Sequence, residues 1–152
     1  MSTLLALTRP TEWNLPLFLH VLGAMILVAG TLTCAAALAF ARGNAAMLRL
    51  GYWSLLAVGV PGYLLMRLGA QWIYSKEGLD EAPIDEAWTG IGFAVADGGA
   101  LLLFIALVVG GIGVRRLDGG KGTGLLKVTL AISVLLLAAY VVAIWAMSAK
   151  PS

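Results

Sequence analysis

The chain has 152 residues, of which 61% are hydrophobic and only 12% are charged. A soluble domain carries roughly a quarter of its residues as charged side chains, so most of this molecule's surface does not face water and a water-soluble enzyme is excluded. The single cysteine, Cys34, excludes an intramolecular disulfide, and the single histidine, His20, excludes metal motifs built on two histidines. The net charge of +2 gives no indication of a nucleic-acid partner.

Four long apolar stretches follow one another along the chain, at about 15–41, 50–74, 87–114 and 125–147. Each exceeds the roughly 20 residues that an α-helix needs to cross about 30 Å of hydrocarbon. Because a bilayer offers no water to unpaired amides, each span must be helical. The sequence therefore predicts an all-α polytopic membrane protein, a single domain over residues 1–152 that forms an up-and-down four-helix transmembrane bundle.

Charged and aromatic residues indicate how the spans are oriented. The links after the first and third spans are basic and contain Arg42, Arg49, Arg115, Arg116 and Lys121, with Lys127 just inside the fourth span. The link between the second and third spans is acidic and contains Glu77, Asp80, Glu81, Asp85 and Glu86 against Lys76. Since short basic links stay in the cytoplasm, we expect a multi-pass protein of the cell membrane with both termini extracytoplasmic. The aromatic residues expected at the outer interface are Trp13, Trp72, Tyr74, Trp88 and Trp145.

Small residues and one proline predict how the helices pack. In lipid, helices associate where small residues allow their backbones to approach. Two series at four-residue spacing are candidate contact seams: Ala29, Thr33, Ala37 and Ala41 in the first span, and Gly92, Ala96 and Ala100 in the third. Pro61, between Gly59 and Gly62, lies inside the second span, where a proline removes a backbone hydrogen bond. We expect a bend there.

Two charged residues, Arg67 and Asp97, lie well within apolar spans. Ionisable groups at such depth normally face the bundle interior or water and have a partner. At about 1.5 Å per residue, Arg67 is roughly 10 Å and Asp97 roughly 13 Å from the outer ends of their spans, so we expect them to meet. His20 in the first span and Tyr140 in the fourth fall at a similar height. The sequence thus predicts a binding site in the outer leaflet made of these four residues.

Three interpretations of this polar layer stay open. A buried pair of Arg and Asp can serve only to set helix register, with His20 and Tyr140 reaching toward the interface. Alternatively, the layer is a pocket, open to the outer face, that holds a ligand, metal or cofactor, with space left by Gly98 and Gly99. The third interpretation is contact with a second copy of the chain or with another membrane subunit.

His20 is a candidate cofactor ligand. One turn later come Gly23 and Ala24, which leave a flat helix face against which a planar group can lie. An axial histidine of this kind fits b-type haem, with Arg67 placed to meet a propionate. Copper is less favoured, because we expect Met66, beside Arg67, to face a different direction. The alternative for a lone histidine near a helix end is an interfacial hydrogen-bonding residue.

Residues 19–24, with the sequence LHVLGA, and Gly30 later in the same span resemble the opening helix of small membrane proteins related to the copper-resistance CopD domain and to HemJ-type haem-binding oxidases. The resemblance covers one helix and the four-span plan, and it implies that His20 ligates haem. The HemJ type pairs this histidine with a lysine in a later helix, whereas the third span here carries Asp97 and no lysine. The resemblance therefore does not extend to protoporphyrinogen oxidation.

The functional predictions fall into three classes. The first is a small membrane protein whose polar site binds haem or another small ligand. The second is a proton or solute transport component in which Asp97 titrates, which requires a homodimer because four helices are few for alternating access. The third is an accessory or scaffold subunit without chemistry that holds a partner through the acidic link 76–86. Enzyme activity has no support, since Asp97 is the one acid within a span and no catalytic set is recognisable.

Overall fold

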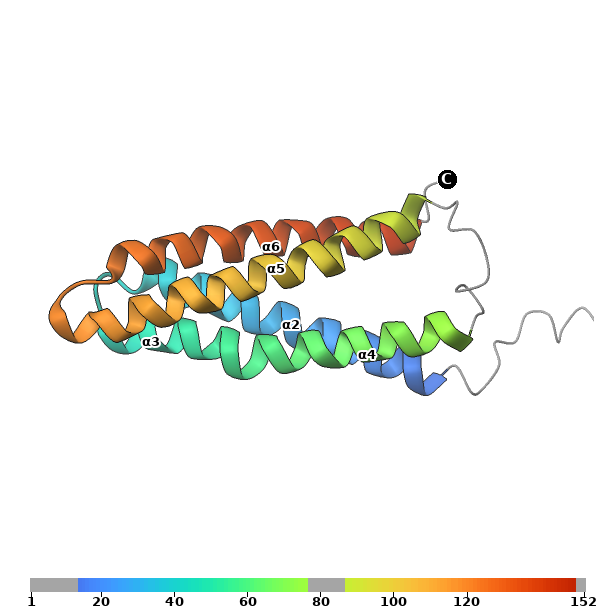
Figure 1. The fold of residues 1–152 in the computed structure, drawn as a ribbon, viewed down its shortest axis with the longest axis horizontal. Helices are drawn as coiled ribbons and strands as arrows, with labels where there is room; N and C mark the ends of the chain where they lie inside the picture. The colour runs from blue at the N-terminus through green and yellow to red at the C-terminus, as the bar shows by residue number, and fades with distance from the viewer. Residues whose placement is uncertain (1–13, 77–86, 150–152) are drawn as a thin grey trace, which may run out of the picture.

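The structure, a computed structural model, describes residues 14–76 and 87–149. These residues form four long helical rods and no strand (Figure 1). In chain order the elements are α2 (Asn14–Phe40), α3 (Ala45–Ser54), a π-helical turn (Leu55–Gly59), α4 (Val60–Lys76), α5 (Ala87–Arg116), a 3₁₀ turn (Leu117–Gly119) and α6 (Thr123–Ala149). All four rods are long and apolar enough to cross a membrane. The predicted all-α class and four-helix plan are confirmed.

The rods run up and down, so that α2 begins and α6 ends at the same end of the bundle, where α4 ends and α5 begins (Figure 1). The helix limits agree with the predicted spans except at the start of the second rod, which begins at Ala45 and not near residue 50. The reason is a helix cap: the Asn44 side-chain oxygen accepts hydrogen bonds from the backbone N–H groups of Ala46 and Met47, at 2.9 and 3.3 Å. Trp13 and the acidic link 77–86 lie outside the described residues.

Where a bend was predicted near Pro61, the structure has a π-helical turn, Leu55–Gly59. The N–H of Val60 donates to the carbonyl of Leu55, five residues back, where an α-helix would use a residue four back. Pro61 has no N–H group to continue the α-helical pattern at this point. The wider turn therefore accommodates the loss of this hydrogen bond without ending the helix, and α3 and α4 form one continuous rod.

Glycines form the contact between α2 and α4. A Cβ built on Gly30 would lie 2.5 Å from the backbone nitrogen of Gly59, and one on Gly69 would lie 2.5 Å from that of His20. Gly23 and Gly62 are equally tight, against the backbones of Met66 and Leu27 respectively, so each of these glycines is in backbone contact with the opposite helix. We call Gly23, Gly30, Gly62 and Gly69 the glycine seam.

The predicted alanine seam of the first span is therefore wrong in part. Ala29 and Thr33 are exposed, whereas Ala37 and Ala41 are buried. The predicted spacing of four residues was the wrong signal, because the glycines that pack recur every seven residues, at 23 and 30 in α2 and at 62 and 69 in α4. A seven-residue repeat keeps one face of a helix against a partner over several turns.

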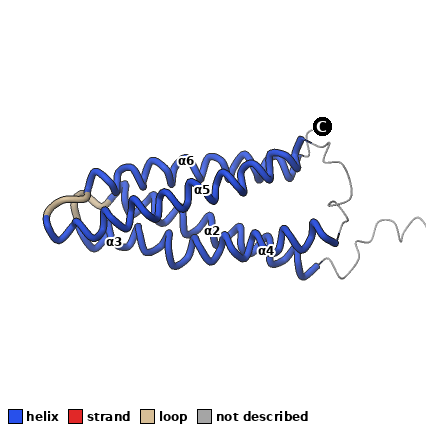
Figure 2. The backbone as a smooth tube through the Cα atoms, in the orientation of Figure 1, coloured by secondary structure: helices blue, strands red, loops and turns tan. Residues whose placement is uncertain are grey.

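The four rods form two hairpin-like pairs. The glycine seam holds α2 against α4, and α5 packs along α6. The pairs are joined through α2 and α6, where the Cys34 sulfur lies 3.5 Å from the Ser133 hydroxyl. Figure 2 shows that the pairs lie close together near the short links and move apart toward the ends of α4 and α6.

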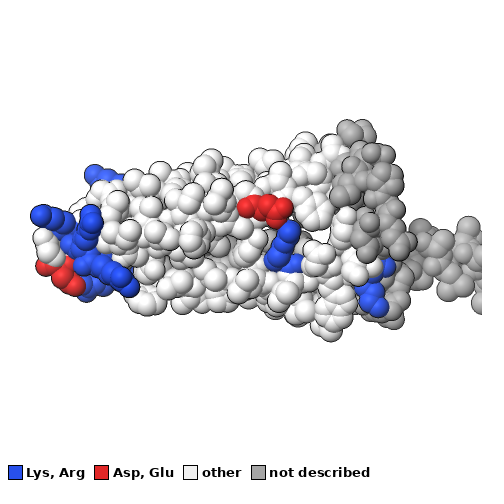
Figure 3. Space-filling model, viewed as in Figure 1, with Lys and Arg blue, Asp and Glu red and all other residues white. Residues whose placement is uncertain are grey.

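Basic side chains are concentrated at one end of the bundle. Lys and Arg gather at the end that holds the short links (Figure 3). Arg49 forms an ion pair there with Asp118. The other ion pair among the described residues joins Arg67 of α4 to Asp97 of α5, within the long rods.

Candidate functional site

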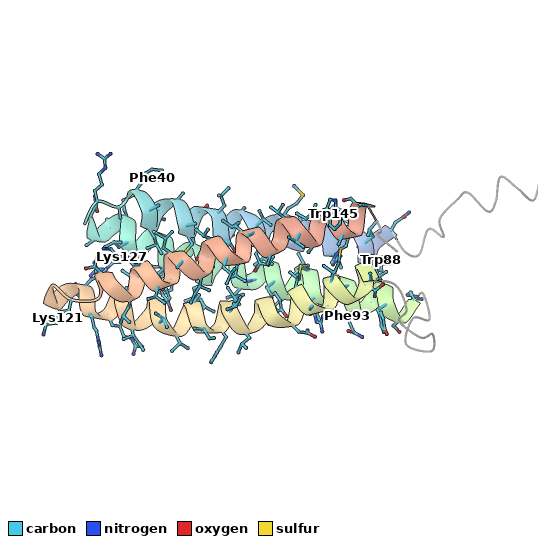
Figure 4. All side chains as sticks on the ribbon, turned by 90° about the horizontal axis from the view of Figure 1, so that it is seen from above. Phe40, Trp88, Phe93, Lys121, Lys127 and Trp145 are labelled. Carbon is cyan, nitrogen blue, oxygen red and sulfur yellow. The ribbon has the colours of Figure 1, made fainter. Side chains whose placement is uncertain are left out.

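A cavity of about 500 Å³ lies between the two helix pairs, at the end opposite the basic links. All four rods contribute to its wall, which is mainly apolar and aromatic. We call it the inter-hairpin cavity and define it by His20 and Leu27 of α2, Met66 and Arg67 of α4, Phe93 of α5 and Tyr140 of α6. Figure 4 shows Trp88, Phe93 and Trp145 toward this end of the bundle, away from Lys121 and Lys127.

His20 stands in the wall of the cavity with one ring nitrogen already engaged. Its Nδ1 lies 3.0 Å from the backbone carbonyl of Met66. A carbonyl oxygen only accepts hydrogen bonds, so Nδ1 carries the proton and donates it. In the neutral ring Nε2 is then unprotonated and has a lone pair for a metal or a hydrogen-bond donor.

The glycine seam sets the position of this imidazole. The backbone of Gly69 packs on the backbone of His20, which brings the Met66 carbonyl within reach of the ring.

The glycine seam also corrects a prediction about the helix face below the ring. Gly23 is covered by the backbone of Met66, so a planar ligand cannot lie on it, whereas Ala24 does line the cavity. Met66, predicted to face elsewhere, also lines the cavity.

Arg67 and Asp97 form the predicted ion pair, with 3.0 Å between the guanidinium Nη2 and the carboxylate Oδ1. Measured from Lys76 and Ala87, Arg67 lies about 14 Å and Asp97 about 15 Å along the helix axes, and this similar depth explains why they meet. The guanidinium also lies over the ring of Phe93, 5.7 Å from its centroid, a distance typical of a cation–π contact.

The two members of this pair have different surroundings. Arg67 lines the cavity and 32% of its side chain is exposed, whereas Asp97 is outside the lining and is 65% exposed. Arg67 thus stands between the cavity and the outer flank of the bundle, and Asp97 stands on that flank. The structure brings His20, Arg67 and Tyr140 to one cavity and leaves Asp97 beside it.

Tyr140 contributes its ring to the cavity and not its hydroxyl. The side chain is 8% exposed, and the buried hydroxyl has no hydrogen-bond partner among the described residues. Thr31, in the neighbouring helix, uses its own hydroxyl to donate to the Leu27 carbonyl at 2.8 Å. A ligand in the cavity therefore meets an aromatic surface at this position.

Side chains that were not predicted to contact one another bridge α4 and α5. Tyr63 donates its hydroxyl hydrogen bond to the carbonyl of Ala96 at 3.2 Å, and the rings of Tyr74 and Phe93 meet edge to face at 5.4 Å. The aromatic content at this end was visible in the sequence. The pairing was not, because it depends on which faces of α4 and α5 turn toward each other.

Comparisons of the chain with models of protein families, with curated proteins and with solved structures give no match. The resemblance to the CopD and HemJ groups therefore stays an interpretation based on the residues around His20. Within the described ranges, no group of three or more His, Cys, Asp or Glu side chains could hold a metal ion.

Proposed function

We propose that the chain is a four-span membrane protein that binds a small, largely apolar ligand in the inter-hairpin cavity, with His20 as the polar anchor. The observation that carries the proposal is the His20 ring itself. Its Nδ1 is hydrogen-bonded to the Met66 carbonyl, which leaves Nε2 as the ring nitrogen for a ligand, and the side chain lines a mainly apolar cavity. A few oriented polar groups in an apolar cavity are typical of small-molecule sites.

The size and lining of the cavity support this class of ligand. Small-molecule pockets commonly measure about 300–1,000 Å³, and this cavity, at about 500 Å³, lies within that range. Among the described lining residues, Arg67 is the charged side chain, and aromatic rings from α4, α5 and α6 supply much of the remaining wall. A ligand with an apolar body is therefore favoured over a hydrophilic one.

Haem b is the cofactor that we propose for this site. The donor chemistry fits: His20 would hold the iron through Nε2, and Arg67 would hold a propionate. The ligand would lie along Ala24 and the α5 side of the cavity, since Gly23 is covered by α4. Bound haem supplies one-electron redox chemistry and strong visible absorption.

The orientation that we propose places the cavity toward the extracytoplasmic face of the cell membrane. Lys and Arg side chains at the opposite end, Arg42, Arg49, Arg115, Arg116, Lys121 and Lys127, support a cytoplasmic location for the short links. Both termini would then be outside. A protease-accessible tag added after Ser152 should be cleaved in intact cells, and protection of that tag would contradict this orientation.

Absorption spectroscopy tests the proposed ligand. The full-length protein, purified in mild detergent from haem-replete cells, should show a Soret band that is lost in His20→Ala. Met25→Ala is the matched control, because Met25 is on the same helix and 65% exposed outside the cavity lining. The control should keep the band.

Organic extraction of the same preparation, followed by mass spectrometry, extends the test to other ligands. A ligand that co-purifies with wild-type protein and is lost in His20→Ala supports the cavity as a binding site and replaces haem as its occupant. A colourless preparation with no extractable ligand contradicts the proposed function.

A further inference from the structure

The inter-hairpin cavity has a side that faces the surrounding membrane. The close backbone contacts join α2 to α3 and α4, α5 to α6, α2 to α6 and, toward the basic links, α3 to α5. The bridges described between α4 and α5 are made by side chains. Tyr74 and Phe93 form one such bridge, and Arg67 and Asp97 another. In the space-filling view the surface is hollowed beside this ion pair (Figure 3). A ligand dissolved in a membrane would enter the cavity from this side, between α4 and α5, because only side chains have to move there.

Arg67 lies at this opening. Its side chain lines the cavity, is one-third exposed and reaches outward to Asp97 on the flank of the bundle. It is the charged group in the described lining, so an anionic group entering between α4 and α5 would be attracted to it. The guanidinium has several N–H donors in a planar fork and can bind a carboxylate or a phosphate through two of them.

Asp97 is poorly placed as a permanent partner. Its carboxylate is 65% exposed on a flank that is otherwise apolar, and an ionised group facing hydrocarbon is unfavourable. The neighbouring Gly98 has open space where a side chain would be, so the helix surface beside Asp97 leaves room for this carboxylate to turn aside. A ligand carboxylate at Arg67 would replace this contact with an equivalent one and add apolar burial in the cavity.

We propose that the cavity takes an acidic amphiphile, an apolar body such as an acyl chain or a porphyrin that carries a carboxylate or phosphate, which enters from the membrane between α4 and α5. The apolar body lies in the cavity, and the acid group takes the place of Asp97 on Arg67. Asp97 is then a competing internal anion that holds the guanidinium when no ligand is bound. This inference rests on the proposed function, because it names the class of ligand for the same cavity.

Quenching of tryptophan fluorescence by brominated chains measures the binding. Trp88 lines the cavity. A full-length protein that keeps Trp88, with Trp13, Trp53, Trp72 and Trp145 replaced by Phe, reports ligand there. A second protein that keeps Trp53 alone reports quencher in the surrounding lipid, since this side chain is exposed and outside the lining. Both are placed in nanodiscs and titrated with dibromostearate or with the corresponding alcohol.

The acid should quench Trp88 at about tenfold lower concentration than the alcohol, because a charge-assisted hydrogen bond is worth about one order of magnitude in affinity. Trp53 should show no difference between the two probes. Arg67→Gln together with Asp97→Asn, which leaves no unpaired charge, should abolish the preference for the acid. Brominated phosphatidic acid, tested in parallel, shows whether a membrane phospholipid or a free fatty acid is the better source of the acid group.

The Asp97→Asn variant tests the competition directly, through the direction in which affinity for the acid changes. Removing the competing carboxylate should raise affinity for the acid about three- to tenfold and leave affinity for the alcohol unchanged. Asp118→Asn is the matched control, because it disrupts the other ion pair, with Arg49, at the far end of the bundle. This control should bind both probes like the parent protein.

The outcomes separate this inference from the proposed function. Equal, Trp88-specific quenching by acid and alcohol keeps the cavity as a binding site and overturns the acidic class. Weaker or unchanged acid binding in Asp97→Asn overturns the competition between Asp97 and the ligand. If neither probe quenches Trp88 beyond Trp53 and no ligand is extracted from the purified protein, the proposed function fails as well.

Discussion

The backbone of Gly69 lies directly against the backbone of His20, so that a Cβ on the glycine would come within 2.5 Å of the histidine nitrogen. This contact holds α2 and α4 close enough for the Met66 carbonyl to accept a hydrogen bond from His20 Nδ1 at 3.0 Å. The tautomer of the only histidine is therefore determined by helix packing. A side chain at position 69 would separate the two helices and free the ring.

The glycine seam should be intolerant of even one methyl group. Gly62→Ala places a Cβ against the backbone of Leu27 and should lower the free energy of unfolding by about 1–3 kcal/mol, since overpacked backbones must shift. Gly98→Ala is the matched control, because open space surrounds that position and alanine favours the helix. Titration with SDS in mixed micelles, followed by circular dichroism, measures both. Equal stability of the two variants would contradict close backbone packing.

The hydroxyl of Tyr140 should be dispensable for stability. It is buried and makes no hydrogen bond of ordinary geometry among the described residues, although the Thr31 side chain interacts with it, and a buried group without a well-formed hydrogen bond costs about 1–3 kcal/mol. Tyr140→Phe should therefore leave the free energy of unfolding unchanged or raise it. A loss of more than about 1 kcal/mol would show that the hydroxyl has a partner in solution.

Tyr63 gives the opposite expectation for the same chemical change. Its hydroxyl donates to the Ala96 carbonyl at 3.2 Å and joins α4 to α5. Tyr63→Phe should lower the free energy of unfolding by about 1 kcal/mol, the usual net worth of one hydrogen bond. The same SDS titration applies, and stability equal to the parent protein would argue against this bridge.

The two ion pairs should differ in strength. A double-mutant cycle with Arg67→Gln and Asp97→Asn should give a coupling free energy above about 1 kcal/mol, because the apolar flank screens the charges poorly. The same cycle with Arg49→Gln and Asp118→Asn should give about 0–1 kcal/mol, as is usual for exposed pairs. Added salt should weaken the second coupling more than the first. Equal coupling free energies would indicate that both ion pairs lie in similar, water-like surroundings.

The cap at Asn44 explains where the second rod begins. Its side-chain oxygen accepts from two backbone N–H groups of the first turn of α3. Asn44→Ala should lower the free energy of unfolding by about 1 kcal/mol. Asn44→Asp should keep most of the stabilisation by the cap, because an aspartate side chain also caps helices. Circular dichroism during SDS titration checks this pair of variants. A stable Asn44→Ala protein would mean that water caps the helix equally well.

The sequence by itself determined the number of helices, their approximate limits and the height at which Arg67 meets Asp97. These features depend on quantities that run along one dimension: the length of an apolar stretch and the rise of about 1.5 Å per residue. That Pro61 disturbs its helix belongs to the same class, since a missing N–H group is a local property. The form of the disturbance, a π-helical turn where a bend was predicted, came from the structure.

Only the tertiary structure decided which face of each helix is turned inward. Asp97 was expected in a shared polar layer and lies on the outer flank, while Met66 was expected to face away and lines the cavity. These helices are apolar on every side, so the hydrophobic pattern carries no signal for the buried face. The rotation of each helix about its axis is instead decided by contacts between distant residues, such as Gly69 with His20. The cavity exists because those contacts close one side of the bundle and leave the other side bridged by side chains.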